Sequence, residues 1–238
     1  MPGSQHVVAG TVLTMPVRVR KADVHTAMFS VPADAAQRLV DYSGLHVCQY
    51  RPGRGVVNLM LARYVDGDLG RYHEFGVCVM VNPPGATAGG WRALSGAAAF
   101  VHRLPVDQTF TLEAGRTIWG FPKTMADFTV CEGRSFGFDV SADGSHIVGI
   151  DFRRGVPVPS LPKPRVLTTY TYADGTTREV PWEMTVTGLR GIVGGATVRL
   201  GDHPYARELA ALGLPKRAMM SGGVANVAMS FGDARVLS

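Results

Sequence analysis

Short runs of apolar or alternating apolar and polar residues recur along the chain and predict a protein built mainly of β-strands. Many runs are rich in Val, Ile, Phe, Thr and Tyr, which pack well on a pleated surface. We expect strands at Val56–Tyr64, Phe75–Val81, Gly96–His102, Ala126–Cys131, Ser135–Val140, His146–Phe152, Arg165–Tyr172, Met184–Val193 and Val224–Phe231.

Two short turns indicate how some of these strands pair. Asp174-Gly175 and Asp143-Gly144 each interrupt an alternating pattern, and Asp-Gly is a typical two-residue turn of a β-hairpin. We therefore expect antiparallel pairing to dominate.

The pattern predicts only two helices. Pro32–Tyr42 begins with proline in its first turn and carries apolar residues at helical spacing. His203–Leu212 follows Asp202, a suitable N-cap, and precedes Gly213, which can end the helix.

A proline-rich stretch at residues 155–164 divides the chain. It either links two domains or forms a stiff crossover between two sheets of one domain. Because only about 75 residues follow it, fewer than a typical domain contains, we favour one domain over residues 1–238 with a crossover at 155–164.

Composition narrows the class of protein. Apolar residues make up 46% and charged residues 18%, which excludes a disordered chain, and no apolar run approaches the roughly 20 residues of a membrane span. The first residues lack the pattern of a signal peptide, so we expect a cytoplasmic protein with no membrane partner.

The net charge is +5, but the basic residues are scattered, so we expect no nucleic-acid partner. The three cysteines and seven histidines lack metal-site spacing, so we expect no metal.

One segment has the character of a reactive site. Lys123 is flanked by Trp119, Phe121, Met125 and Phe128, and Gly120 and Pro122 would form a rigid turn before it; the chain has only four lysines. An ordinary lysine has a pKa of about 10.4, and burial lowers the pKa and makes the amine nucleophilic. The residues alone leave open a surface lysine at a strand end.

The same segment and four others occur in an order that resembles a known family. Arg116 and Gly120-Phe121-Pro122-Lys123 are similar to the signature of the acetoacetate decarboxylase family. The remaining matches are Arg71-Tyr72-His73-Glu74, Gly194–His203, Leu214-Pro215 and the last strand, Ala234–Leu237. The resemblance extends from about residue 20 to the end of the chain.

The resemblance implies both a fold and a chemistry. The fold is mainly β (α+β), a largely antiparallel sheet closed into a cone or barrel with a few peripheral helices, and the protein forms a homo-oligomer. The chemistry is a Schiff base between Lys123 and a small keto-acid substrate, which needs no cofactor and no metal. Glu74 would be the second catalytic residue, as general acid or base.

We expect the substrate-binding residues to surround this pair. They are Arg116, Phe121, Trp119, Tyr72 and Asn58. Arg116 either forms a structural ion pair or binds a substrate carboxylate. Family members also have a substrate-binding arginine near the N-terminus, for which Arg18 and Arg20 are the candidates.

Two departures from the family pattern bear on the reaction. Thr124 replaces a second lysine, and Asn58 lies where a second carboxylate is expected. Three functions therefore stay open: decarboxylation of a β-keto acid, a pyruvate-dependent aldolase or dehydratase using the same lysine, and a non-catalytic small-molecule-binding barrel. Because Thr124 carries no charge, we expect weak decarboxylation of acetoacetate and a better reaction with pyruvate or another 2-oxo acid.

Overall fold

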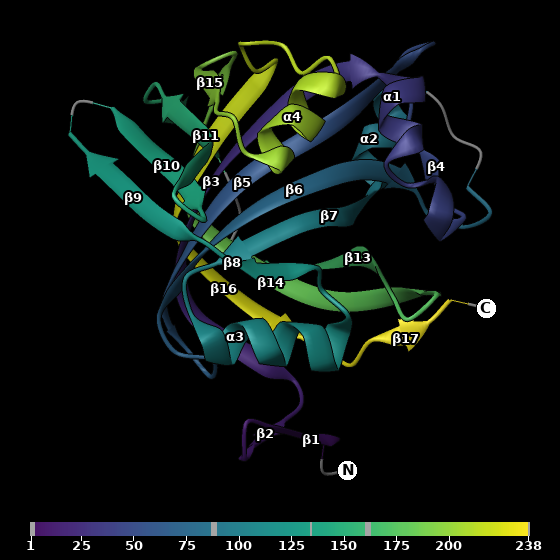
Figure 1. The fold of residues 1–238 in the computed structure, drawn as a ribbon, viewed down its shortest axis with the longest axis vertical. Helices are drawn as coiled ribbons and strands as arrows, with labels where there is room; N and C mark the ends of the chain where they lie inside the picture. The colour runs from purple at the N-terminus through teal and green to yellow at the C-terminus, as the bar shows by residue number, and fades with distance from the viewer. Residues whose placement is uncertain (1–2, 87–89, 134, 160–162, 238) are drawn as a thin grey trace.

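The computed structural model describes residues 3–86, 90–133, 135–159 and 163–237, and these residues form a mainly β structure (Figure 1). The strands are β1 (Gln5–Val8), β2 (Thr11–Thr14), β3 (Val17–Pro32), β4 (His46–Val47), β5 (Arg54–Gly67), β6 (Tyr72–Asn82), β7 (Ala98–Val106), β8 (Lys123–Met125), β9 (Asp127–Glu132), β10 (Phe136–Ala142), β11 (Ser145–Phe152), β12 (Val156–Pro157), β13 (Arg165–Ala173), β14 (Thr176–Val193), β15 (Ala196–Leu200), β16 (Met220–Phe231) and β17 (Arg235–Val236). Each of the nine expected strands overlaps one of these.

Seven strands of the larger sheet close into a ring. Their order is β6–β5–β3–β16–β14–β13–β7, and β7 pairs again with β6. Every neighbouring pair in the ring is antiparallel except β7 and β13, which run parallel over a short stretch. The short strand β8 adds to β7 in parallel. The prediction of a largely antiparallel, closed sheet is confirmed.

A smaller sheet of four antiparallel strands, in the order β15–β11–β10–β9, packs against the outside of this ring. Asp143 and Asp174 both have positive φ, and each closes an antiparallel hairpin, β10 with β11 and β13 with β14. Both predicted hairpins are therefore confirmed.

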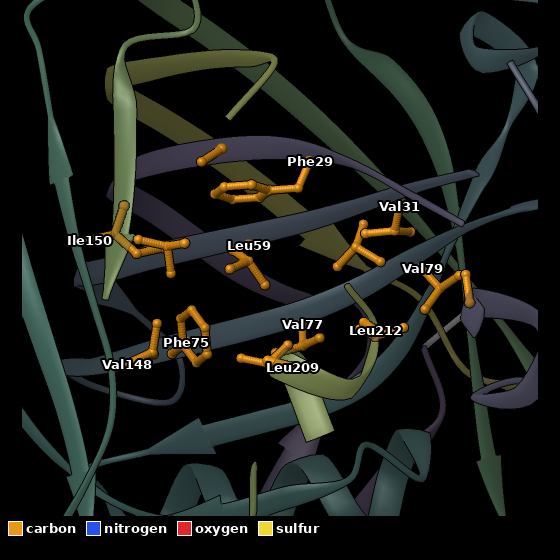
Figure 2. Close-up of a cluster of buried hydrophobic side chains, with 14 of the residues drawn as sticks. Phe29, Val31, Leu59, Phe75, Val77, Val79, Val148, Ile150, Leu209 and Leu212 are labelled. Carbon is orange, nitrogen blue, oxygen red and sulfur yellow. The ribbon is translucent and has the colours of Figure 1, made fainter. Parts of the chain in front are cut away.

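The main hydrophobic core lies between the two sheets and under helix α4 (Pro204–Ala211). Figure 2 shows Phe29 and Val31 of β3, Leu59 of β5 and Phe75 of β6 facing Ile150 of β11, with Leu209 of α4 beside them. A second core fills the inside of the ring and includes Trp119 and Phe121. The long strands β3, β5 and β6 contribute side chains to both cores, because successive residues point to opposite faces of a sheet.

The helices differ from the sequence expectation in three respects. The first, α1 (Ala33–Arg38), ends before Tyr42 and is followed by a 3₁₀ turn, η1 (Asp41–Ser43). The N-cap of α4 is His203 rather than Asp202, since the His203 ring accepts the backbone N–H of Tyr205. Sequence patterning did not predict the remaining helical segments, α2 (Trp91–Gly96), α3 (Thr109–Ala114) and the π-helical turn η2 (Gly115–Trp119).

The proline-rich stretch joins the smaller sheet to the larger one. It follows β11, and β12 pairs with Arg190 and Gly191 of β14. Its central part, residues 160–162, lies outside the described residues. None of the helices in the described part of the chain is long and apolar enough to cross a membrane.

Candidate active site

A cavity of about 210 Å³ lies inside the ring of strands. Its wall is mostly aliphatic and aromatic, with side chains from β3, β5, β6, β7, β14 and β16. Among the described residues that line it, only Lys123 and Glu74 carry a formal charge. The volume is smaller than the roughly 300–1,000 Å³ of pockets for drug-sized ligands, so the cavity suits a small molecule.

The Lys123 amine is held by two polar partners in this cavity. The residue is 3% exposed. Its Nζ lies 2.7 Å from Oε2 of Glu74 and donates to Oγ1 of Thr111 at 2.8 Å. Nζ also lies 5.0 Å from the centre of the Tyr72 ring, a cation–π distance. The buried ammonium therefore has both a counter-charge and a hydrogen-bond acceptor.

Two glycines allow the chain to bring Lys123 inward. A Cβ on Gly115 would lie 2.6 Å from both Cδ and Cε of Lys123, so the lysine stem passes directly over a residue without a side chain. Gly120 has φ of +68° and ends η2, and the backbone N–H of Phe121 donates to the Gly115 carbonyl. The expected rigid turn at Gly120 is thus present, and it follows a π-helical turn.

Glu74 is fixed from the other side. It is 6% exposed, and its Oε1 accepts the hydroxyl of Tyr64 at 2.8 Å. The Tyr64 ring stacks on Tyr72 with centroids 4.2 Å apart. Burial and the Glu74 charge raise the pKa of both tyrosines well above the ordinary value. Burial raises the pKa of the nearby Cys78 thiol to about 12, so all three groups stay neutral at pH 7.

Four of the five side chains expected to bind substrate line the cavity with Lys123 and Glu74. They are Phe121, Trp119, Tyr72 and Asn58. Asn58 Oδ1 accepts a hydrogen bond from Thr26, which leaves the amide nitrogen as a donor. Trp119 is anchored by donation from Nε1 to the Gly232 carbonyl at 2.8 Å.

The structure does not bring Arg116 into the cavity. Its side chain is exposed, and its Nε donates to the main-chain carbonyl of Lys123 at 2.8 Å. This contact holds the backbone at the lysine, and Arg116 is not among the described residues that line the cavity. The physical reason is that η2 turns the arginine outward while β8 turns the lysine inward.

The other cations considered from the sequence also lie outside the cavity. Arg18 and Arg20 are exposed, whereas their neighbours Val17 and Val19 line the cavity from the opposite face of β3. Arg20 pairs with Asp66 and Asp68. Thr124 follows Lys123 in β8 and is not among the lining residues, as alternation along a strand requires.

Sequence reasoning missed Thr111, Tyr64 and Cys78. Thr111 belongs to α3, a six-residue helix without a clear periodic pattern, and its side chain is fully buried. Tyr64 and Cys78 lie in strands that were predicted, at positions pointing inward with Glu74. Every second residue of a strand points to the same face, and applying this alternation to β5 and β6 would have placed Tyr64 and Cys78 on the same face as Glu74. Across the described residues, no group of three His, Cys, Asp or Glu side chains is arranged to hold a metal.

The family model of acetoacetate decarboxylase (ADC) matches residues 6–238, almost the whole chain. No curated protein matches the sequence at a significant level.

Solved structures share the fold at low sequence identity. An acetoacetate decarboxylase from Legionella pneumophila is 18% identical, with a TM-score of 0.66 over 94% of this chain and 87% of that one. The enduracididine biosynthesis enzyme MppR, complexed with pyruvate, is 19% identical, with a TM-score of 0.65 over 95% of this chain and 92% of that one. An acetoacetate decarboxylase-like enzyme from Sphingomonas wittichii is 14% identical, with a TM-score of 0.58 over 99% and 100%.

Proposed function

Because the chain belongs to the acetoacetate decarboxylase family, we propose that it is a Schiff-base-forming lyase that acts on a small keto acid through Lys123. One observation carries the proposal: the Lys123 amine is buried in a mainly apolar cavity, 2.7 Å from a carboxylate that can take its proton. Glu74 is the proton acceptor and donor of the reaction, and Thr111 orients the amine.

The reaction begins with proton transfer from the Lys123 ammonium to Glu74. The free amine adds to the substrate ketone, and loss of water gives a protonated imine. In a β-keto acid, the bond to the carboxylate then breaks, its electron pair enters the imine, and CO2 leaves. Protonation of the resulting enamine carbon and addition of water release the ketone and restore the amine.

The apolar wall favours the decarboxylation step. A carboxylate bound against aliphatic and aromatic side chains is poorly solvated. Breaking its bond gives neutral CO2, so the poorly solvated negative charge is removed from the apolar wall as the bond breaks. Apart from Lys123 itself, no cation among the described lining residues would hold the carboxylate in place.

A second candidate is a condensation in which pyruvate forms the imine and its enamine attacks an aldehyde. Two observations favour it. The free amide nitrogen of Asn58 offers a neutral donor that a retained carboxylate or carbonyl needs. The fold is also similar to that of MppR, for which one structure contains the condensation product of pyruvate and imidazole 4-carboxaldehyde.

Product analysis separates the two. The purified protein is incubated with acetoacetate, or with pyruvate and an aldehyde, and the assay follows CO2 release and the condensation product. Decarboxylation predicts CO2 from acetoacetate that disappears in Lys123→Met. Condensation predicts a new carbon–carbon bond without CO2. A protein that forms neither product, but binds keto acids equally well in Lys123→Met, would be a binding protein.

A further inference from the structure

A second hollow, of about 440 Å³, lies on the outer face of the ring, where β3, β5, β14 and β16 meet the ends of β10 and β11. We call it the arginine cleft, after Arg63, Arg153, Arg154 and Arg190. It shares no lining residue with the lysine cavity. Along β5, Arg63 faces the cleft while the next residue, Tyr64, faces the lysine cavity.

The charge in the arginine cleft is unbalanced. Asp23 is the one acidic residue among its described lining residues. Asp23 and Glu132 both pair with Arg63, so that arginine is compensated. Within the described part of the chain, the side chains of Arg153 and Arg154 have no hydrogen-bond or ion-pair partner. Among the described residues, Arg190 makes one side-chain hydrogen bond, from Nε to the Gly155 carbonyl at 2.8 Å, and its two terminal nitrogens have no partner there.

Two buried nitrogen atoms of residues that line the cleft lack partners. His25 Nδ1 and Arg63 Nε are buried without a hydrogen bond among the described residues. Burial and the Arg63 charge lower the pKa of His25 to about 4, so the ring is neutral at pH 7 and can donate through one nitrogen. Buried polar atoms are nearly always satisfied in folded proteins, so the unpaired atoms point to a ligand that accepts hydrogen bonds.

We propose that the arginine cleft binds a small organic polyanion, through phosphate or carboxylate oxygens held by Arg153, Arg154 and Arg190. Guanidinium groups present paired N–H donors that match both oxyanions, and unlike lysine they keep their charge. Gly222 and Gly223 form part of the wall, and the His25 ring lies close against Gly223, where a Cβ would be 3.0 Å from Nε2. This site does not depend on the chemistry proposed for Lys123.

Isothermal titration calorimetry of the full chain with pyrophosphate and with citrate, at constant ionic strength, tests the proposal. We expect saturable one-site binding. Preference for pyrophosphate identifies a phosphate ligand, and preference for citrate identifies a carboxylate ligand. Arg153→Ala/Arg154→Ala should weaken anion binding by at least about tenfold. Replacing both arginines by lysine should weaken binding less, because lysine keeps the charge but lacks the paired donors.

The matched control is Arg92→Ala/Arg235→Ala. It removes the same charge from two exposed arginines that do not line the cleft. The control should change the dissociation constant by less than about twofold. Lys123→Met should bind the anion as the unmodified protein does. Equal losses in the two double variants would show attraction by overall charge and overturn the proposal, as would absence of binding at millimolar anion.

Discussion

The amine of Lys123 and the carboxylate of Glu74 form a buried ion pair with an Nζ–Oε2 distance of 2.7 Å. Burying a charge is costly unless it is paired, and here each charge is the counter-ion of the other. In the proposed reaction the same pair supplies the proton path for imine formation, because Glu74 can take the proton that blocks the lysine lone pair. On this proposal, one contact serves both folding and chemistry.

Removing one member of this pair should destabilise the protein more than removing both. Lys123→Met and Glu74→Gln each leave an unpaired buried group and should each lower the free energy of unfolding by about 3–5 kcal/mol. The double variant should lose less than either single variant, because it leaves no uncompensated buried charge. Urea unfolding of the four proteins gives the coupling. Additive losses would mean that the two groups do not interact in solution.

Gly115→Ala should disable the lysine while leaving the fold intact. Gly115 has helical backbone angles that alanine adopts readily, but the new Cβ would meet the Lys123 stem at 2.6 Å. We expect at least about a tenfold loss in the rate of imine formation, since a small misplacement of a reacting group is enough for such a loss.

Gly96→Ala is the matched control for Gly115→Ala. Gly96 ends a helix, and a Cβ there has no neighbour within 4 Å. The control should keep full imine formation. Unchanged chemistry in Gly115→Ala would show that the lysine does not follow this path.

Thr111→Val tests the second partner of the amine. Valine has nearly the same shape but removes the oxygen that accepts from Lys123 at 2.8 Å. A lost hydrogen bond to a buried charge costs about 1–3 kcal/mol, so imine formation should slow by about tenfold or more. Thr111→Ser keeps the hydroxyl and should keep most of the rate. If serine were as slow as valine, packing rather than the hydroxyl would explain the effect.

Position 124 should matter less than the sequence suggested. Thr124 does not line the cavity, so a lysine there would point away from Lys123. We expect Thr124→Lys to change the rate of imine formation with acetoacetate by less than about threefold, measured by rapid borohydride quenching. A large acceleration would show that a cation at this position acts across the strand.

Site residues on regular β-strands could be placed from the sequence, whereas those on short or irregular helical turns could not. Lys123 and Glu74 were identified through the ordered family motifs, because the residues around Lys123 alone left a surface lysine open. Alternation in β5 and β6 explains why Glu74, Tyr64 and Tyr72 face one cavity. The position of Arg116 outside the cavity could not be predicted from residue spacing, because the π-helical turn η2 and the turn at Gly120 separate it from Lys123. Thr111 was missed because α3 is short and held by its Gln108 cap and tertiary packing rather than by its own periodicity.

Stability should fall in mild acid through His25. Its pKa is about 4 in the folded protein, because of burial and the Arg63 charge, whereas an unfolded histidine has a pKa of about 6.5. Between these values the unfolded chain binds more protons, so His25 stabilises the fold above pH 6.5 and its contribution, up to about 3 kcal/mol, is lost as the pH falls to 4.

Replacing His25 isolates this contribution. His25→Phe keeps an aromatic ring stacked on Phe136 but cannot take a proton. Urea unfolding at pH 7.5 and pH 4.5, in buffers without phosphate or citrate, should give a smaller loss of stability for the variant than for the unmodified protein. Identical losses would mean that other groups carry the pH dependence.

Borohydride trapping with peptide mapping tests the Lys123 imine most directly. The chain has only four lysines, so Lys21, Lys163 and Lys216 are controls within the same molecule. The protein is mixed with acetoacetate or pyruvate, reduced, digested and analysed by mass spectrometry. We predict a reduced keto-acid adduct, or the adduct of its decarboxylated product, on the Lys123 peptide and on no other. No adduct with either acid, or equal labelling of the four lysines, would contradict the Schiff-base account.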